Sequence, residues 1–146
     1  MTTFTISLAG FCVEINSIFE NTRIFCRDYL CEGTPEFSVT ISPKDITYER
    51  EKSAKEDLLE GIPVRQFSDK YLETLAVYRK ICTLFLEKGI LLFHGSAVEV
   101  DGKAYLFTAK SGTGKSTHTA LWRQVFGDWA VMINDDKPLL KLTSDG

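Results

Sequence analysis

Apolar and polar residues near the N-terminus alternate with the two-residue period of a β-strand. In residues 3–15 this alternation is interrupted by Ala9-Gly10, a pair suited to a turn. Residues 36–42 alternate in the same way, and turn residues lie on both sides of them. The pattern predicts two short strands joined at Ala9-Gly10 and a third strand over 36–42.

Two segments of the N-terminal half lack a clear apolar period. Residues 17–30 fit a helix and a strand equally well. Residues 44–60 are charged and mostly polar. A charge run of this kind is most often solvated, so we expect a strand-to-loop connection on the surface there.

A helix is predicted to begin near residue 68. Ser68 or Asp69 can cap its first turn, and apolar residues then recur at helical spacing from Leu72 to Leu86. Gly89 is suited to ending it. The wide apolar face predicts a long, largely buried helix that belongs to the core rather than to a cofactor site.

The C-terminal half reads as short strands around one further helix. Asp101-Gly102 is a strong signal for a two-residue hairpin, because both central residues of such a turn need a positive φ. The hairpin joins a strand over 97–100 to one over 104–108. The other predicted elements are strands over 90–93, within 129–138 and over 139–142, and a helix over 117–126.

Composition narrows the class of protein. The 146 residues are 44% hydrophobic and 25% charged, as in ordinary globular domains, and the net charge is −3. No basic stripe suggests nucleic-acid binding. No apolar run approaches the roughly 18 to 20 residues of a membrane span, and the N-terminus lacks the features of a secretory signal.

The four cysteines have spacings that match no metal-binding pattern. They are Cys12, Cys26, Cys31 and Cys82, and we expect reduced thiols in a cytoplasmic protein. We expect two regions, a small β-rich region over 1–67 and, over 68–146, a helix followed by the first part of a nucleotide-binding domain. Uncovered sheet edges would favour a homo-oligomer.

The candidate chemistry lies in residues 107–122, FTAKSGTGKSTHTALW. Gly112, Gly114, Lys115 and Ser116 match the end of the phosphate-loop pattern G-x-x-x-x-G-K-[ST], between a predicted strand and a predicted helix. Ala109 stands where the pattern has its first glycine. Alanine fits that place if its φ is negative, so we expect phosphate binding to be weakened or unchanged.

Such a loop binds the phosphates of ATP with Mg²⁺. Glycines let backbone N–H groups turn inward, the following helix adds its positive end, Lys115 reaches the phosphates and the Ser116 hydroxyl binds the metal. The expected nucleotide-binding residues are Ser111, Gly112, Thr113, Gly114, Lys115, Ser116 and Thr117.

Two carboxylates are candidates for the other half of the site. Asp135 and Asp136 end the strand after the loop's helix, where an adjacent parallel strand would deliver them beside Mg²⁺. One would bind the metal and the other would take the proton of an attacking hydroxyl. His94 ends the strand over 90–93 and is a candidate neighbour of this pair.

The segment HGSAVEVDGKAYLFTAKSGTGKST…INDD resembles the superfamily of HPr kinase and ATP-dependent phosphoenolpyruvate carboxykinase. The resemblance covers roughly residues 90–142. It implies an α/β (α+β) fold whose nucleotide-binding part is a mixed β-sheet P-loop kinase core, after a small β-rich region and a long helix. By resemblance, Lys115 contacts the phosphates, Ser116 binds Mg²⁺, Asp135 is the proton acceptor or the metal partner, and His94 supports the carboxylate. The expected catalytic residues are therefore Asp135, Asp136, His94 and Lys115, and the expected metal ligands are Ser116 and Asp136, with the roles of the two aspartates open to exchange.

The resemblance implies transfer of the γ-phosphoryl group of ATP to a hydroxyl of a protein, peptide or small molecule. The chain ends before the second half of that family, so we expect further contacts to lie outside it. Three alternatives stay open. They are a carboxykinase-like enzyme, a nucleotide-binding module or inactive fragment without catalysis, and a structural domain in which the loop is a coincidence.

Overall fold

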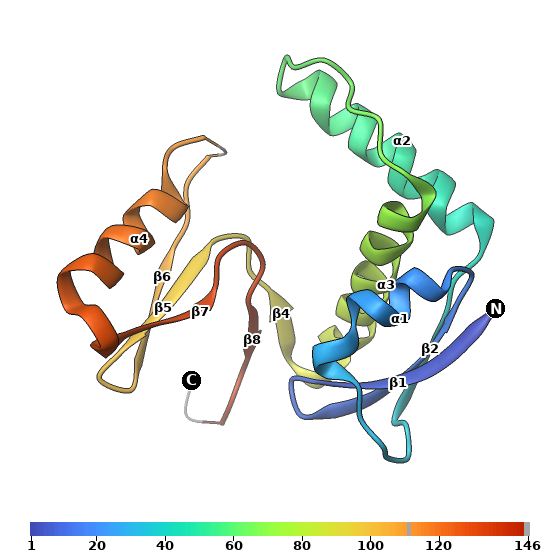
Figure 1. The fold of residues 1–146 in the computed structure, drawn as a ribbon, viewed down its shortest axis with the longest axis horizontal. Coiled ribbons are helices and arrows are strands. Elements are labelled where there is room, and N and C mark those ends of the chain that lie inside the picture. The colour runs from blue at the N-terminus through green and yellow to red at the C-terminus, as the bar shows by residue number, and fades with distance from the viewer. Residues whose placement is uncertain (111, 145–146) are drawn as a thin grey trace. The chain divides into compact units, whose positions relative to one another are not determined.

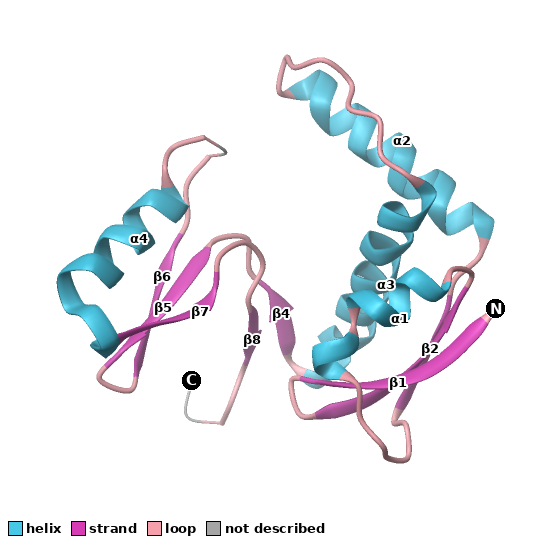
Figure 2. Cartoon of the chain, in the orientation of Figure 1, coloured by secondary structure: helices cyan, strands magenta, loops and turns pink. Residues whose placement is uncertain are grey.

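The computed structural model describes residues 1–110 and 112–144. Within them the chain has a mixed α+β fold with three small sheets and four α-helices (Figure 1). It divides into two compact units, Met1–Glu87, called unit 1, and Lys88–Gly146, called unit 2. Figure 2 shows that helices and strands are present in both units.

Unit 1 begins with a three-stranded sheet of β1 (Thr2–Leu8), β2 (Phe11–Ser17) and β3 (Phe37–Thr40). β1 and β2 pair antiparallel, and the turn residues Ala9 and Gly10 have φ values of 52° and 85°. β3 runs parallel to β2. The three strands predicted from the apolar alternation are confirmed.

Most of the ambiguous segment 17–30 is helical, between Ser17 at the end of β2 and Leu30, which forms a bridge with Ile6. A parallel strand pair needs a crossover, and here the crossover contains α1 (Glu20–Phe25) and the 3-10 helix η1 (Arg27–Tyr29). The buried Glu73 carboxylate accepts hydrogen bonds from the backbone N–H groups of Ile18 and Phe19 and from the Thr22 hydroxyl. It therefore satisfies donors at the start of α1 that the helix itself leaves unpaired.

The long helix predicted after residue 68 is α3 (Asp69–Phe85). Ser68 caps it, since its hydroxyl accepts from the Tyr71 N–H at 3.3 Å. The 3-10 helix η2 (Leu86–Lys88) follows, and Gly89 reverses the chain with a φ of 68°. This prediction is confirmed.

The surface connection predicted over 44–60 is wrong, because that segment forms α2 (Pro43–Leu59). Ser42 and Asp45 make a capping box, and Pro43 occupies the first helical position. Ile46 is the buried apolar residue of this helix. Helix α2 is attached to α3 largely by ion pairs. Glu49 and Asp45 of α2 pair with Arg79 and Lys80 of α3, respectively.

The sequence predicted a boundary before α3, between the ranges 1–67 and 68–146. In the structure α3 belongs to unit 1, so the boundary lies after this helix. The helix packs on α2, on α1 and on strands β2 and β3. Its apolar face completes the core of unit 1. The buried apolar side chains of that core are Phe4, Ile6, Val13, Ile15, Val39, Ile41, Ile46, Leu72, Ala76, Val77, Ile81 and Phe85.

Unit 2 follows the order predicted from the sequence. Asp101 and Gly102 have φ values of 53° and 70°, which confirms the predicted two-residue hairpin. The elements are β4 (Ile90–Leu92), β5 (Ser96–Val100), β6 (Lys103–Phe107), α4 (Lys115–Phe126), the 3-10 helix η3 (Gly127–Trp129), β7 (Ala130–Asn134) and β8 (Leu139–Lys141).

The strands of unit 2 correct the expectation of one mixed sheet. Its described residues form two sheets, one with the order β6-β5-β7 and one pairing β4 with β8, and every pair in them is antiparallel. β7 is therefore not an adjacent parallel neighbour of β6. Both strands oppose β5, so they run in the same direction and end at the same edge of the sheet.

One face of the β6-β5-β7 sheet packs against α4. Tyr105 and Phe107 of β6 have their rings against Trp122, at centroid distances of 4.9 and 5.3 Å. The Trp122 indole N–H also donates to His118 Nε2 at 3.1 Å. On the opposite face, Val131 and Ile133 of β7 are about half exposed.

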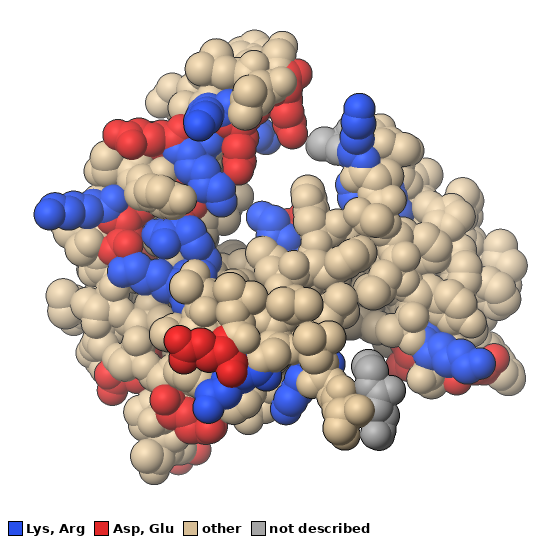
Figure 3. Space-filling model, turned by 180° about the vertical axis from the view of Figure 1, so that it is seen from behind, with Lys and Arg blue, Asp and Glu red and all other residues tan. Residues whose placement is uncertain are grey.

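Charges on the surface show no dominant sign. Figure 3 shows basic and acidic side chains interspersed over unit 1, whereas the same view of unit 2 is mostly uncharged. Within the part of the chain that the structure describes, no helix is both long and apolar enough to cross a lipid bilayer.

Candidate phosphate-binding site

The loop between β6 and α4 has the backbone that its glycines predict. Gly112 and Gly114 have φ values of 76° and 98°, a region in which residues with a Cβ are strained. Gly114 is the N-cap of α4, and its carbonyl accepts the first helical hydrogen bond from the His118 N–H at 2.9 Å. Ser111 lies outside the described residues.

Ala109 is not strained by its place in the loop. Among the described residues, the non-glycine positions with positive φ are Ala9 and Asp101, both in hairpin turns. The condition under which alanine fits at the first loop position is therefore met.

Hydrogen bonds within the loop converge on its first residues. The Lys115 ammonium donates to the carbonyl oxygens of Ala109 at 2.9 Å and of Lys110 at 3.4 Å. The Thr113 hydroxyl donates to the same Lys110 carbonyl at 2.8 Å. Lys115 thus lies across the loop, while Ser116 and Thr117 belong to the first turn of α4.

Asp135 is held at this edge of the sheet by one buried hydroxyl group and lies beside a second. Ser96 of β5 donates to Asp135 Oδ1 at 2.7 Å, and Thr119 of α4 is 3.5 Å from the same oxygen. Both hydroxyl residues have no exposed surface. The Thr119 hydroxyl also donates to the Ser116 carbonyl at 3.1 Å. Asp135 is therefore linked to the beginning of α4.

Asp136 lies beside His94, as the sequence predicts. His94 Nε2 is 3.6 Å from Asp136 Oδ1, and both side chains are about two-thirds exposed, at 65% and 68%. The Lys137 ammonium is 3.7 Å from the other carboxylate oxygen. The pair is therefore accessible to a ligand from solvent.

The backbone fixes the His94–Asp136 neighbourhood from both sides. The Gly95 N–H donates to the Asp136 carbonyl at 2.9 Å, and the Thr108 hydroxyl donates to the His94 carbonyl at 3.2 Å. A Cβ on Gly95 would press against the Phe107 carbonyl oxygen. Close approach of β6 thus explains why glycine follows His94.

Three residues that the sequence analysis did not name support the carboxylates. They are Ser96, Thr119 and Asn134. The side-chain oxygen of Asn134 accepts hydrogen bonds from the N–H groups of Asp136 at 2.9 Å and Lys137 at 2.8 Å. Ser96 shares the inward face of β5 with Val98 and Val100. The polar side chain of Ser96 at an inward strand position could have indicated a supporting role, because buried hydroxyl groups need hydrogen-bond partners.

The described residues contain no group of three or more His, Cys, Asp or Glu side chains suited to a metal ion. A Mg²⁺ ion that bridges substrate phosphates needs only one or two protein ligands, with water and phosphate oxygens completing its shell. Ser116 and a single aspartate therefore constitute a donor set that fits such an ion.

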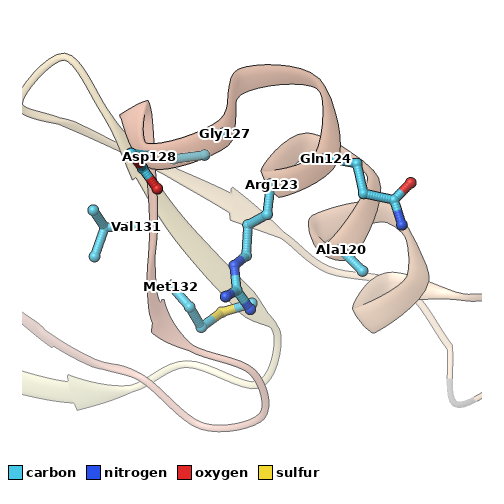
Figure 4. Close-up of a pocket in the computed structure, with 8 residues that line it drawn as sticks. Ala120, Arg123, Gln124, Gly127, Asp128, Val131 and Met132 are labelled. Atoms are coloured by element: carbon cyan, nitrogen blue, oxygen red, sulfur yellow. The ribbon is translucent and has the colours of Figure 1, made fainter.

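A groove of about 730 Å³ lies elsewhere in unit 2, along the second half of α4 (Figure 4). Arg123 extends toward Met132 across it, and Asp128 lies at its other end. Its remaining lining residues are Ala120, Gln124, Gly127, Ala130 and Val131. No described residue of the loop lines this groove, so it is distinct from the candidate phosphate site.

No protein-family model, curated protein or solved structure matches the chain.

Proposed function

We propose that unit 2 binds ATP with Mg²⁺ and transfers the γ-phosphoryl group to a hydroxyl, with a P-loop kinase core of the HPr-kinase-like type. One observation carries the proposal. Gly112 and Gly114 adopt positive φ immediately before Lys115 and Ser116 at the start of a 12-residue helix. This combination supports the proposal because it supplies backbone donors, a cation and a hydroxyl within a few residues of each other, and a polyphosphate requires all three.

Each part of the loop has a defined role in this proposal. The N–H groups of Gly112 and of residues 114–117 and the positive end of α4 bind phosphate oxygens, whereas the Thr113 N–H donates to the Lys110 carbonyl at 3.3 Å. Lys115 exchanges its bonds to the Ala109 and Lys110 carbonyls for bonds to phosphate. Ser116 contributes its hydroxyl to the metal. When bound, Mg²⁺ supplies positive charge that neutralises the phosphates.

The surroundings of the two aspartates favour different roles for them. Asp135 is fixed by Ser96 and lies beside Thr119 of α4, toward the Ser116 end of the site. We assign it to the metal, in place of the Asp136 assignment made from the sequence. Asp136 is exposed and lies beside His94, which suits a group that accepts the proton of an incoming hydroxyl.

A nucleotide-binding module without catalysis is the second candidate. The exposure of His94 and Asp136 favours it, because efficient phosphoryl transfer depends on excluding bulk water from the reacting groups. Both candidate functions predict that the chain binds ATP, but only the kinase predicts that ATP is converted to ADP.

The test is calorimetric titration of the chain with ATP, with and without Mg²⁺. We expect Mg²⁺-dependent binding that Lys115→Ala weakens by roughly ten- to a hundredfold, since hydrogen bonds to charged groups contribute about 1.5–3 kcal/mol. Lys103→Ala is the matched control, because this exposed lysine starts β6 at the end opposite the loop. Equal binding by both variants would contradict the proposed site.

Turnover separates the two candidates. If the chain is a kinase, ADP forms from ATP in the presence of hydroxyl acceptors, and Asp136→Asn stops this while ATP binding persists. If it is a binding module, ATP binds and remains intact. A folded chain that does not bind ATP under either condition would exclude both.

A further inference from the structure

Two cysteine thiols are in contact in unit 1. Cys12 at the start of β2 and Cys31 after η1 have their sulfurs 3.4 Å apart, and both side chains are half-buried. Nineteen positions separate them in the sequence. They belong to unit 1, whereas the candidate phosphate site belongs to unit 2.

The backbone holds each thiol in place. Cys12 lies in the β1–β2 ladder opposite Ser7, and its carbonyl accepts from the Glu36 N–H at 2.8 Å. The Cys31 N–H donates to the Thr5 carbonyl at 3.0 Å. Because both segments are anchored to the same sheet, the backbone keeps the two sulfurs close to each other.

The turn after Cys31 packs against the pair. A Cβ on Gly33 would lie 3.2 Å from Cys12 Sγ, which is tighter than ordinary contact. Glycine therefore leaves just enough room for the sulfur. A disulfide needs the sulfurs at about 2.05 Å, so they must approach by little more than an ångström, within the reach of side-chain rotation.

We propose that Cys12 and Cys31 form an oxidation site that closes to a disulfide with low-molecular-weight disulfides of the glutathione class. One cysteine thiolate attacks the small disulfide, forming a mixed disulfide and releasing one small thiolate. The other cysteine thiolate attacks the protein sulfur of that bond and releases the second. Two protein thiols are oxidised, one small disulfide is reduced, and the two cysteine protons end on the released thiols.

The link would fasten residues 27–36 to the β1–β2 hairpin. Besides the pair itself, hydrogen bonds from the Cys31 and Glu36 N–H groups hold this segment to the sheet. The Cys12 N–H also donates to Glu36 Oε1 at 3.5 Å, and Leu30 forms an isolated bridge with Ile6. A covalent link restricts the unfolded chain, so oxidation is expected to raise the melting temperature of unit 1.

The reaction is expected to speed up as the pH rises. The hydrogen bond with Cys31, burial, and the charges of Cys31 and Glu36 raise the pKa of Cys12. Little of this thiol is ionised at neutral pH, and only the thiolate attacks a disulfide.

The experiment treats the full chain with oxidised glutathione at neutral and alkaline pH. Free thiols are then alkylated after unfolding, and the peptides are mapped by mass spectrometry. We expect a linked peptide containing Cys12 and Cys31, a mass lower by two hydrogen atoms, and alkylated Cys26 and Cys82. Reduction with a dithiol should restore the original mass.

Single substitutions provide the controls. Cys12→Ser and Cys31→Ser should each abolish the link, whereas Cys82→Ser and Cys26→Ser should leave it intact. Circular dichroism checks that each variant is folded. The proposal is overturned if Cys12 and Cys31 are still alkylated after the treatment of a folded chain, if the mixed disulfide with glutathione persists, or if another pair forms the link.

Discussion

Gly95 is the residue of the candidate site with the least room for a side chain. A Cβ placed on it would clash with the Phe107 carbonyl oxygen and the Phe93 ring, and its N–H donates to the Asp136 carbonyl. Gly95→Ala must therefore push β6 away from the His94–Asp136 pair. We expect unit 2 to lose about 2 kcal/mol in denaturant unfolding, within the range found for overpacking.

Gly102→Ala is the control for that substitution. Gly102 has a φ of 70°, and no atom lies within 4 Å of the place that an alanine methyl would take, so its variant carries backbone strain without a steric clash. Left-handed strain costs about 1 kcal/mol. An equal or smaller loss for Gly95→Ala would contradict the close approach.

The candidate site residues could be named from the sequence, but the residues that contact and position them could not. Positive φ at Gly112 and Gly114 follows from the loop pattern, and His94 was expected beside the carboxylates. Ser96 and Thr119 lie far apart in the sequence, and both lie beside Asp135. The inward position of Ser96 indicates that its hydroxyl needs a partner, but no local pattern indicates which partner.

At the scale of elements, the apolar pattern succeeded where a helix or strand buries apolar residues and failed for α2. That helix has Ile46 as its buried apolar side chain, so no apolar stripe marks it. Its start was nevertheless readable, because Ser42, Pro43 and Asp45 form a capping box with proline at the first position. Cap residues were the better evidence here.

Strand order was the other failure at this scale. The Asp101-Gly102 hairpin indicates that β5 and β6 are neighbours, but nothing local shows on which side of β5 the returning β7 pairs. Because β7 pairs with β5, the strand that precedes Asp135 is separated from β6 by one strand. The carboxylates still reach the loop's edge, since β6 and β7 run in the same direction.

The contact between α2 and α3 should weaken in acid. Burial raises the pKa of the Asp45 carboxyl, but hydrogen bonds from Ser42 and Lys80 and the charge of Lys80 lower it more, to about 2. The ordinary value is 3.8, so the contribution of Asp45 is fully present above about pH 4 and is lost as the pH falls toward 2.

Helix circular dichroism in urea, followed from pH 5 to about pH 2, tests this expectation. Asp45→Asn should lower the free energy of unfolding above pH 4 and reduce its further decline below that pH. Asp28→Asn is the control, because the Asp28 side chain is 80% exposed. Parallel curves for the wild type and Asp45→Asn would contradict the assignment.

At the scale of the whole molecule, the two units differ in how much apolar core they bury. Phe85 and most of the buried apolar side chains belong to unit 1, as do the two 17-residue helices α2 and α3. Unit 2 buries mainly small or β-branched residues, and Val131 and Ile133 on one face of its sheet are about half exposed. Its buried apolar residues are Ile90, Ala97, Val98, Val100 and Ala130. Unit 2 should therefore be the less stable of the two.

Two signals can report the units separately during unfolding. The chain has two tryptophans, Trp122 and Trp129, and both belong to unit 2, whereas most of the helical signal comes from α2 and α3 in unit 1. We expect the tryptophan fluorescence transition at lower denaturant than the helix transition. ATP with Mg²⁺ at a hundredfold excess over its dissociation constant should stabilise only the fluorescence transition, by about 2.7 kcal/mol. Coincident transitions that move together would show instead that the two units unfold as one.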